Sequence, residues 1–177
     1  MSEFKEIYFA GGCFWGTEKV FQSLHGVVST TVGYANGTVA SPSYELVKTD
    51  TTGHRETVKV IYDSERISLN KLLKAFFICI DPTVSNRQGN DIGSQYQTGV
   101  YYTDEASGKT AEKVFDEVRR NYDPFCVELA PLSCFYDAEE YHQDYLIKNP
   151  GGYCHITGEE YDRVLELNDM PDPDLAT

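Results

Sequence analysis

The sequence lacks the excess of positive charge and the long apolar runs that mark several large classes of protein. It carries 15 Lys and Arg against 28 Asp and Glu, and its formal net charge is −13 at pH 7. A chain this acidic is repelled by nucleic-acid backbones and by anionic membrane surfaces, so neither is expected as a partner. No run approaches the roughly 18 apolar residues of a membrane span, and no basic start leads into an apolar stretch. We therefore expect a cytoplasmic protein.

The five cysteines lack the spacing of a disulfide framework or of a zinc site. They are Cys13, Cys79, Cys126, Cys134 and Cys154, and no two of them form a C-x-x-C pair. An odd and scattered set in a reducing compartment predicts neither a structural disulfide nor a metal site. The question becomes which of these thiols is reactive.

The chain also lacks internal repeats, low-complexity tracts and linkers rich in Pro or Ser. Its 177 residues, of which 41% are hydrophobic, are enough for a self-contained core. We expect one domain over residues 1–165. An acidic tail over residues 166–177, interrupted by prolines, is expected to be loosely ordered.

Hydrophobic periodicity predicts strands and helices mixed along the chain. Strands are expected over residues 5–10, 27–34, 57–62, 99–102 and 127–132. Helices are expected from residue 13 to about 25, and over 69–80, 104–122 and 138–146. Helices of this length can cover one face of a sheet, which predicts an α+β domain of two layers. The segments 35–55 and 81–97 have no regular pattern, and loops of that length usually carry function.

Cys13 lies between a predicted strand and a predicted helix, in the run Gly11-Gly12-Cys13-Phe14-Trp15-Gly16. The free N–H groups and the positive dipole end at a helix N-terminus favour a thiolate, which predicts a lowered pKa and a reactive thiol. Phe14 and Trp15 would form an apolar wall beside the sulfur. The alternative, a buried structural cysteine, is equally compatible with this motif alone.

The other thiols have different surroundings. Cys79, Cys126 and Cys134 lie among apolar residues and are interpreted as core cysteines. Cys154 lies in a Pro- and Gly-containing loop, residues 148–155. A thiol on a mobile loop suits a resolving role, in which it attacks an oxidised cysteine and forms a disulfide.

Acids and phenols in and beside the long loops could serve a reaction. Tyr44 and Tyr96 each lie in one of these loops, and a phenol there can donate to a substrate oxygen. Glu56 begins a predicted strand, and a carboxyl group near aromatic residues can act as a general acid at neutral pH. The alternative is a solvated loop with Asx-turns. His54 and His142 are interpreted as structural histidines.

Four motifs together resemble the A-type methionine sulfoxide reductases, the peptide-methionine (S)-S-oxide reductases. They are Gly12-Cys13-Phe14-Trp15-Gly16, Gly53-His54-x-Glu56, the run from Asn86 to Tyr96, and Tyr141 to Leu146 followed by Gly152-Tyr153-Cys154. They occur in the same order across roughly residues 7–155. The resemblance implies a two-layer α/β plait with a mixed, largely antiparallel sheet covered by helices.

The resemblance also implies a role for each matching residue. Cys13 would attack the sulfur of the S epimer of methionine sulfoxide, free or in proteins, and Glu56 would protonate the departing oxygen. Tyr44 and Tyr96 would hydrogen-bond that oxygen, and Asp91 would help through a bound water. The activity implied is a reductase that repairs oxidised proteins under oxidative stress.

The substrate pocket and the recycling step follow from the same resemblance. Phe14 and Trp15 would hold the S-methyl group of the substrate. Cys13 would be left as a sulfenic acid, and Cys154 would form a disulfide with it that thioredoxin reduces. Neither a metal nor an organic cofactor is implied, and we expect a monomer.

The sequence departs from the family pattern at a few positions. Asn36-Gly37 replaces a glycine pair, Ile80 replaces a histidine, and Gln97 replaces an arginine, a change that could alter peptide preference. A second cysteine after Cys154 is absent, so one resolving step is expected. None of these changes removes a group that the chemistry needs.

Two other functions fit parts of the pattern. A Cys–His acyl transferase would use Cys13 as nucleophile and His54 or His142 as base, which leaves Cys154 without a role. A binding module would use an aromatic pocket and would leave every thiol unchanged.

Overall fold

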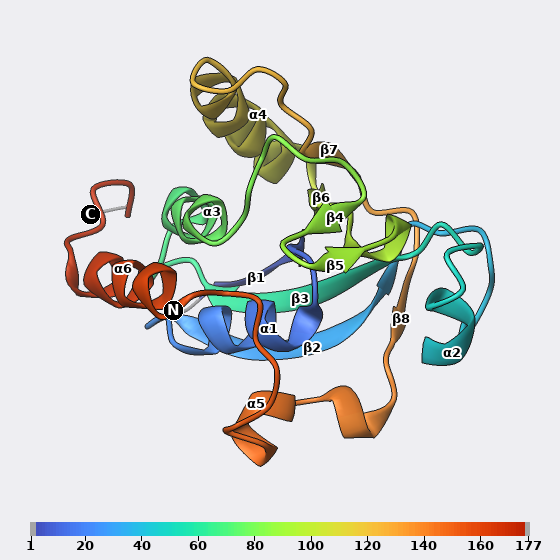
Figure 1. Cartoon of the computed structure of the whole chain (residues 1–177). Coiled ribbons are helices and arrows are strands. Elements are labelled where there is room, and N and C mark those ends of the chain that lie inside the picture. The colour runs from blue at the N-terminus through green and yellow to red at the C-terminus, as the bar shows by residue number, and fades with distance from the viewer. Residues whose placement is uncertain (1–2, 176–177) are drawn as a thin grey trace.

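The computed structural model describes residues 3–175 and is built around a six-stranded sheet, with strand order β7-β6-β1-β3-β2-β8 (Figure 1). Its strands are β1 (Phe4–Ala10), β2 (Val27–Ala35), β3 (Arg55–Asp63), β6 (Gly99–Tyr102), β7 (Glu128–Pro131) and β8 (Phe135–Asp137). Only β6 and β7 pair in parallel; the other neighbours are antiparallel. A separate hairpin joins β4 (Arg87–Gln88) to β5 (Asp91–Ile92). The predicted mixed, largely antiparallel sheet is confirmed.

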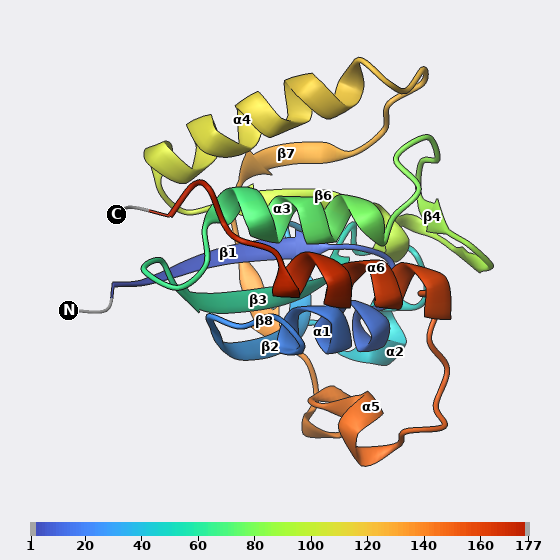
Figure 2. The same ribbon diagram turned by 90° about the vertical axis from the view of Figure 1, so that its left-hand side faces the viewer.

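Within residues 3–175 the chain forms six α-helices, and the longer ones lie over one face of this sheet (Figure 2). They are α1 (Phe14–Gln22), α2 (Tyr44–Val47), α3 (Leu69–Ile78), α4 (Glu105–Arg119), α5 (Tyr145–Lys148) and α6 (Gly158–Asp169). Helices α1, α3 and α4 provide the main second layer, and α6 packs over α3. Within residues 3–175, no helix is long and apolar enough to cross a membrane.

The core follows from the alternation of side chains along β1. Ile7 and Phe9 face the helices, whereas Tyr8 and Ala10 face the other side of the sheet. The Phe9 ring stacks on Phe21 of α1, with centroids 4.3 Å apart. Burying an aromatic or aliphatic side chain of this kind stabilises a fold by about 1.5–3 kcal/mol. This packing fixes α1, and therefore the residue that precedes it, against the sheet.

Two predicted helices start where the sequence indicated but end earlier. The Ser68 hydroxyl accepts a hydrogen bond from the Lys71 N–H and begins α3, as a Ser N-cap should. Asp104 caps α4 in the same way. Helix α4 ends at Arg119 and not at residue 122 as predicted, and Tyr122 beyond it is 42% exposed.

The single helix expected over residues 138–146 is wrong. The chain forms a short 3-10 turn over Glu140–His142, then an extended residue, then α5. The Gln143 amide both accepts from the Val32 N–H and donates to the Val32 carbonyl, so it is tied to β2. Asp144 follows with φ +54°, a left-handed conformation that cannot continue an α-helix.

The C-terminal segment contains a helix that the sequence reading missed. Helix α6 crosses the domain boundary expected at residue 165, and Thr157 and Glu160 form a capping box at its start. Beyond α6, the Asp172 carboxylate accepts hydrogen bonds from the N–H and hydroxyl of Ser68, both at 2.8 Å. The expected loose tail is therefore attached to α3 as far as residue 172. Residues 176–177 of that tail, like residues 1–2, lie outside the described part of the chain.

Candidate active site

The register of two antiparallel strands brings Cys13 and Glu56 to one end of the sheet. Phe9 of β1 pairs with Val58 of β3, so the chain that leaves β1 passes the start of β3. There the Phe14 N–H, the first of α1, donates to Glu56 Oε1 at 3.3 Å. Glu56 follows Cys13 by 43 residues in the sequence. The fold nevertheless places its carboxyl group at the N-terminus of α1, where Cys13 is the N-cap.

Cys13 is the N-cap residue of α1 and is 7% exposed. The residue before it, Gly12, has φ +88°, which favours glycine. A Cβ on Gly12 would also stand 2.8 Å from the Gln88 Cβ of β4. The β4–β5 hairpin therefore packs closely against the turn that contains Gly12 and Cys13.

Glu56 is 2% exposed, and burial raises its pKa to about 8. The hydrogen bond from the Phe14 N–H opposes this shift, and the charge of Asp91 adds to it. A carboxyl group with this pKa is mostly protonated at pH 7. It can therefore give a proton to a departing oxygen, as a general acid must.

The pKa of Cys13 moves against our prediction. Burial, followed by the charge of Glu56, raises it well above its ordinary value, although the Trp15 backbone N–H lowers it. The helix N-terminus was expected to lower this pKa, but the loss of solvent at a 7% exposed thiol outweighs that effect. Protonation of Glu56 removes one of the two main causes of the rise.

Both predicted phenols lie beside this pair. Tyr44 is the first residue of α2, and Tyr96 ends the 3-10 turn that follows β5. Burial raises the pKa of Tyr44 to about 12, and the charges of Glu56 and Cys13 add to the rise. Burial raises the pKa of Tyr96 too, again with Glu56 as the leading charge. Both phenols therefore stay protonated and can donate.

Asp91 joins the site to the loop that carries Cys154. Its Oδ2 accepts a hydrogen bond from the Tyr153 hydroxyl at 3.0 Å. Its charge also raises the pKa of both Cys13 and Glu56, so it lies near them. Asp91 thus takes part in a contact with the Cys154 loop that the sequence alone did not indicate.

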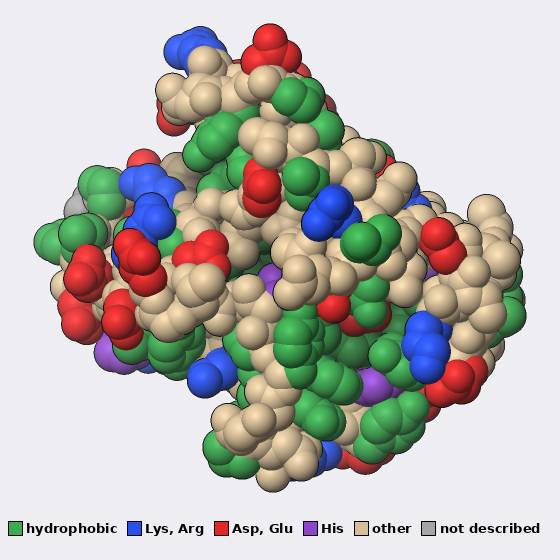
Figure 3. All heavy atoms as spheres, in the orientation of Figure 1, with side chains coloured by type: hydrophobic (Ala, Val, Ile, Leu, Met, Phe, Trp, Pro, Cys, Tyr) green, Lys and Arg blue, Asp and Glu red, His purple; other side chains and the backbone are tan. Residues whose placement is uncertain are grey.

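Aromatic side chains surround the helix start. Trp15 stacks on Tyr145, with centroids 3.7 Å apart, and its Nε1–H donates to His142 Nδ1 at 3.1 Å. The His142 ring lies 5.2 Å from Phe14 and 4.5 Å from Tyr44, centroid to centroid. Figure 3 shows a recess below the β4–β5 hairpin, ringed by hydrophobic side chains, with acidic and histidine atoms visible inside it. Sequence analysis predicted the Phe14 and Trp15 wall but missed Tyr145 and His142.

His54 and His142, both predicted to be structural, have different surroundings in the structure. His54 Nδ1 accepts from the Gly37 N–H at 3.1 Å, so its other nitrogen donates to the Val39 carbonyl at 2.6 Å. Both ring nitrogens of His54 are occupied, in agreement with a structural role. His142 is 1% exposed, and burial lowers its pKa, so the ring is neutral at pH 7.

Cys154 lies closer to the site than its sequence context indicated. Its Sγ stands 2.9 Å from the point that a Cβ on Gly16 would occupy, within the first turn of α1. The thiol is half-buried rather than exposed, and all five cysteines are free. Among the expected core cysteines Cys79 is buried, whereas Cys126 and Cys134 are partly exposed.

The departures from the family pattern serve packing and hydrogen bonding here. Gln97 is buried and links two segments, since its Oε1 accepts from the Asn86 N–H and its amide donates to the Cys126 carbonyl. Ile80 follows α3 and joins the core. Its side chain lies 3.6 Å from the place of a Gly11 Cβ, beside the reactive loop.

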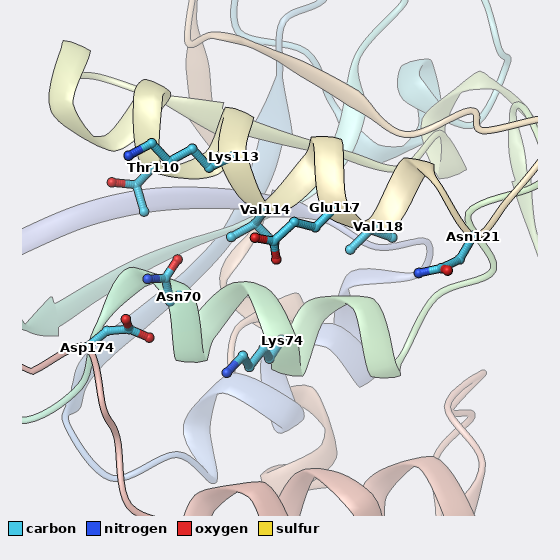
Figure 4. Close-up of a pocket in the computed structure, with 9 residues that line it drawn as sticks. All are labelled: Asn70, Lys74, Thr110, Lys113, Val114, Glu117, Val118, Asn121 and Asp174. Carbon is cyan, nitrogen blue, oxygen red and sulfur yellow. The ribbon is translucent and has the colours of Figure 1, made fainter.

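A surface groove lies away from this site. Figure 4 shows a groove of about 550 Å³ between α3 and α4, lined mainly by polar residues such as Lys74, Lys113 and Glu117. None of the site residues lines it. The groove therefore has no part in the chemistry around Cys13.

Comparison with known proteins decides the family. A family model described as peptide methionine sulfoxide reductase matches residues 5–171. The chain belongs to this family. A peptide methionine sulfoxide reductase of Lachnoclostridium phytofermentans is 54% identical over 153 residues, which cover 86% of this chain and 92% of that protein.

The fold of the chain is also similar to solved structures. Reduced Mxr1 from Saccharomyces cerevisiae has a TM-score of 0.83 at 38% identity, covering 88% of this chain and 92% of that one. Mxr1 in complex with Trx2 has a TM-score of 0.59 at 28% identity, covering 81% and 85%. The family membership makes the chain an oxidoreductase, and the predicted α/β fold is confirmed.

Proposed function

We propose that the chain reduces the S epimer of methionine sulfoxide, free or in proteins, with Cys13 as nucleophile and thioredoxin as the final reductant. One observation carries this proposal: the group beside the Cys13 thiol is a buried acid. Glu56 meets the Phe14 N–H at 3.3 Å and has a pKa near 8. Sulfoxide reduction needs an acid at this place, because an oxygen must be protonated as it leaves sulfur.

The first step transfers oxygen from the substrate to Cys13. The Cys13 sulfur attacks the sulfoxide sulfur as Glu56 protonates the oxygen, and the proton that the Cys13 thiol loses restores the Glu56 carboxyl group. Tyr44 and Tyr96, both protonated at neutral pH, donate to that oxygen and stabilise its charge. Methionine then leaves and Cys13 carries the hydroxyl group as a sulfenic acid. Asp91 would help through a water, as the family resemblance implies.

The aromatic recess would receive the S-methyl group. Phe14 is buried and Trp15 is held by both a ring stack and a hydrogen bond, so the wall is preformed. A preformed wall loses little entropy when the substrate binds.

The second step closes a disulfide between Cys13 and Cys154. Cys154 lies against Gly16 in the first turn of α1, and Gly16 is three residues after Cys13 in the sequence. The complex of the yeast relative with Trx2 supports a thioredoxin as the protein that reduces this disulfide. The cytoplasmic location and the monomeric state expected from the sequence stay predictions.

The acyl-transferase alternative named His54 or His142 as the base, and neither is placed to serve Cys13. Both nitrogens of His54 are bonded to backbone groups, and His142 Nδ1 accepts from Trp15. Glu56 is mostly protonated and cannot act as a base at pH 7. These contacts favour sulfoxide reduction.

Counting free thiols tests the proposal. The reduced protein, mixed with methionine S-sulfoxide without reductant, should lose two thiols per chain and release one methionine. The R epimer should cause neither change. Unchanged thiols with the S epimer would contradict the proposal, and equal loss with both epimers would contradict the stereospecificity.

A further inference from the structure

We propose that His155 takes the proton from the Cys154 thiol, so that Cys154 attacks the oxidised Cys13 as a thiolate. This inference rests on the proposed function and adds a base for its second step. The sequence alone does not indicate a role for His155. Its neighbours in the structure point to one.

The hydrogen bond of the His155 ring defines which nitrogen is free. Nε2 lies 2.7 Å from the Gly11 carbonyl oxygen, which only accepts, so Nε2 carries the hydrogen. In the neutral ring Nδ1 then has a lone pair. Nδ1 is buried and has no hydrogen-bond partner among residues 3–175. A buried acceptor without a partner is uncommon and calls for an explanation.

Nδ1 and the Cys154 sulfur both lie near one point in the first turn of α1. The Cys154 thiol donates to the Ile156 carbonyl at 3.6 Å in this structure, so it must turn from that carbonyl to give its proton to Nδ1. The place of a Cβ on Gly16 lies 2.9 Å from Cys154 Sγ and 3.3 Å from His155 Nδ1. Gly16 stands three residues after Cys13, and side chains three apart on a helix lie about 5–6 Å from each other. The absence of a side chain at Gly16 thus makes room, beside Cys13, for both the resolving thiol and the imidazole.

The ring is neutral and can therefore accept a proton. Burial lowers the pKa of His155, while the Gly11 carbonyl and the charges of Asp91 and Glu160 oppose this. Asp91 belongs to β5 and Glu160 to α6. At pH 7 an ordinary thiol is only about 3% ionised, so a neutral imidazole beside it can supply the nucleophile.

The step balances as follows. Nδ1 accepts the Cys154 proton, and the thiolate attacks the sulfur of the Cys13 sulfenic acid. The new S–S bond forms as the S–O bond breaks, and the leaving hydroxide takes a proton to become water. His155 returns its proton to solvent. Cys154 is oxidised and the sulfenic sulfur is reduced, with no other reactant.

A His155→Gln variant separates this role from simple anchoring. The Gln amide can still donate to the Gly11 carbonyl, so the anchor remains while the base is lost. We expect methionine release in a single turnover to stay within about twofold of the unaltered protein. Disulfide formation, followed as loss of the second thiol, should slow at least tenfold at pH 7, within the usual range for general-base catalysis. A sulfenic-acid probe should then label Cys13. His25→Gln, at an exposed histidine, should change neither rate.

The outcomes distinguish the two proposals. If the variant forms the disulfide at the unaltered rate, the His155 proposal fails and the proposed function stands. If the unaltered protein itself loses no thiols, the proposed function fails.

A second measurement needs no variant. With His155 as base, the disulfide step of the unaltered protein should be nearly constant between pH 7 and 8. A rise of about eightfold over that unit, as expected for a thiol of ordinary pKa that ionises unaided, would overturn the inference.

Discussion

Cys13 and Cys154 belong to one proposed reaction, but the protein holds them in opposite ways. Cys13 connects β1 to α1, so strand register and helix packing fix it in a buried place. Cys154 lies on the irregular segment between α5 and α6. Side-chain hydrogen bonds hold that segment: the Tyr153 hydroxyl bonds to β5, and His155 bonds to the Gly11 carbonyl.

The difference reflects what each thiol must do. The Cys13 region must exclude water, because burial is what raises the pKa of Glu56 to about 8. In the proposed reaction the Cys154 region moves toward Cys13 and later opens to a reductant. Its two hydrogen bonds are each worth only about 1 kcal/mol, so they can place the loop and still release it.

Removing the second thiol should produce the largest effect that separates the two regions. In Cys154→Ser, one methionine per chain should form at the unaltered rate, because the Cys13 region is intact. Turnover with thioredoxin should fall by about two orders of magnitude or more, since no thiol displaces the sulfenic hydroxyl. A coupled assay beside a single-turnover assay measures both. Cys126→Ser, at a partly exposed cysteine without a proposed role, is the control. Normal turnover of Cys154→Ser would remove the resolving role.

The buried acid should make the Cys13 region less stable as pH rises. The carboxyl group of Glu56 has an ordinary pKa near 4.5 when unfolded and about 8 when folded. Between these values the unfolded chain releases a proton that the folded chain keeps, so stability is lost with rising pH. Glu56→Gln should therefore raise the free energy of unfolding by up to about 5 kcal/mol at pH 8 and by far less at pH 5.

Thermal unfolding at the two pH values checks this prediction. Glu112→Gln, at an exposed glutamate on α4, should show no such pH-dependent difference. A Glu56→Gln variant with equal stabilisation at both pH values would mean that the folded carboxyl is already ionised.

Filling the space at Gly16 should disturb the Cys154 region more than the Cys13 region. A Cβ there would stand 2.9 Å from Cys154 Sγ, too close for an unchanged loop. Gly16→Ala should slow disulfide formation about tenfold, because a small displacement of a reacting atom is costly. Methionine release should change less. Gly151→Ala, in the segment that carries Cys154, is the control, since nothing lies within 4 Å of its added Cβ. Equal slowing of both steps would show that the two regions are not separable.

The smallest effect should come from the C-terminal segment, which contacts neither thiol. Asp172→Ala removes the hydrogen bonds from Ser68 and should lower the free energy of unfolding by about 1 kcal/mol. Activity should not change. Urea unfolding measures the loss, and Asp174→Ala, at an exposed neighbour, serves as control. A loss of activity in Asp172→Ala would connect this segment to the site.

Local sequence signals were enough to predict most of the fold. The apolar periodicity marked α3 and α4 because these helices form from near neighbours. The segment 138–146 failed because Gln143 bonds to Val32, a residue of a distant strand. Helix α6 was missed although its Thr157 capping box could be found in the sequence.

Individual residues of the site were predictable, but their environment was not. The Cys13 motif and Glu56 could be identified from residue type and position. The direction of the Cys13 pKa was wrong, because burial at that place depends on strand register. The contact between Trp15 and His142 joins residues 127 apart, so no local pattern indicates it.

In the proposed mechanism Glu56 protonates the sulfoxide oxygen as Cys13 attacks. The most direct test is the rate of methionine release in a single turnover at pH 7, measured for Glu56→Gln beside Glu112→Gln. We predict a fall of about 10²–10⁴ in Glu56→Gln alone, with alkylation of Cys13 by iodoacetamide within about threefold of the unaltered protein. Methionine release by Glu56→Gln at the unaltered rate would contradict the claim.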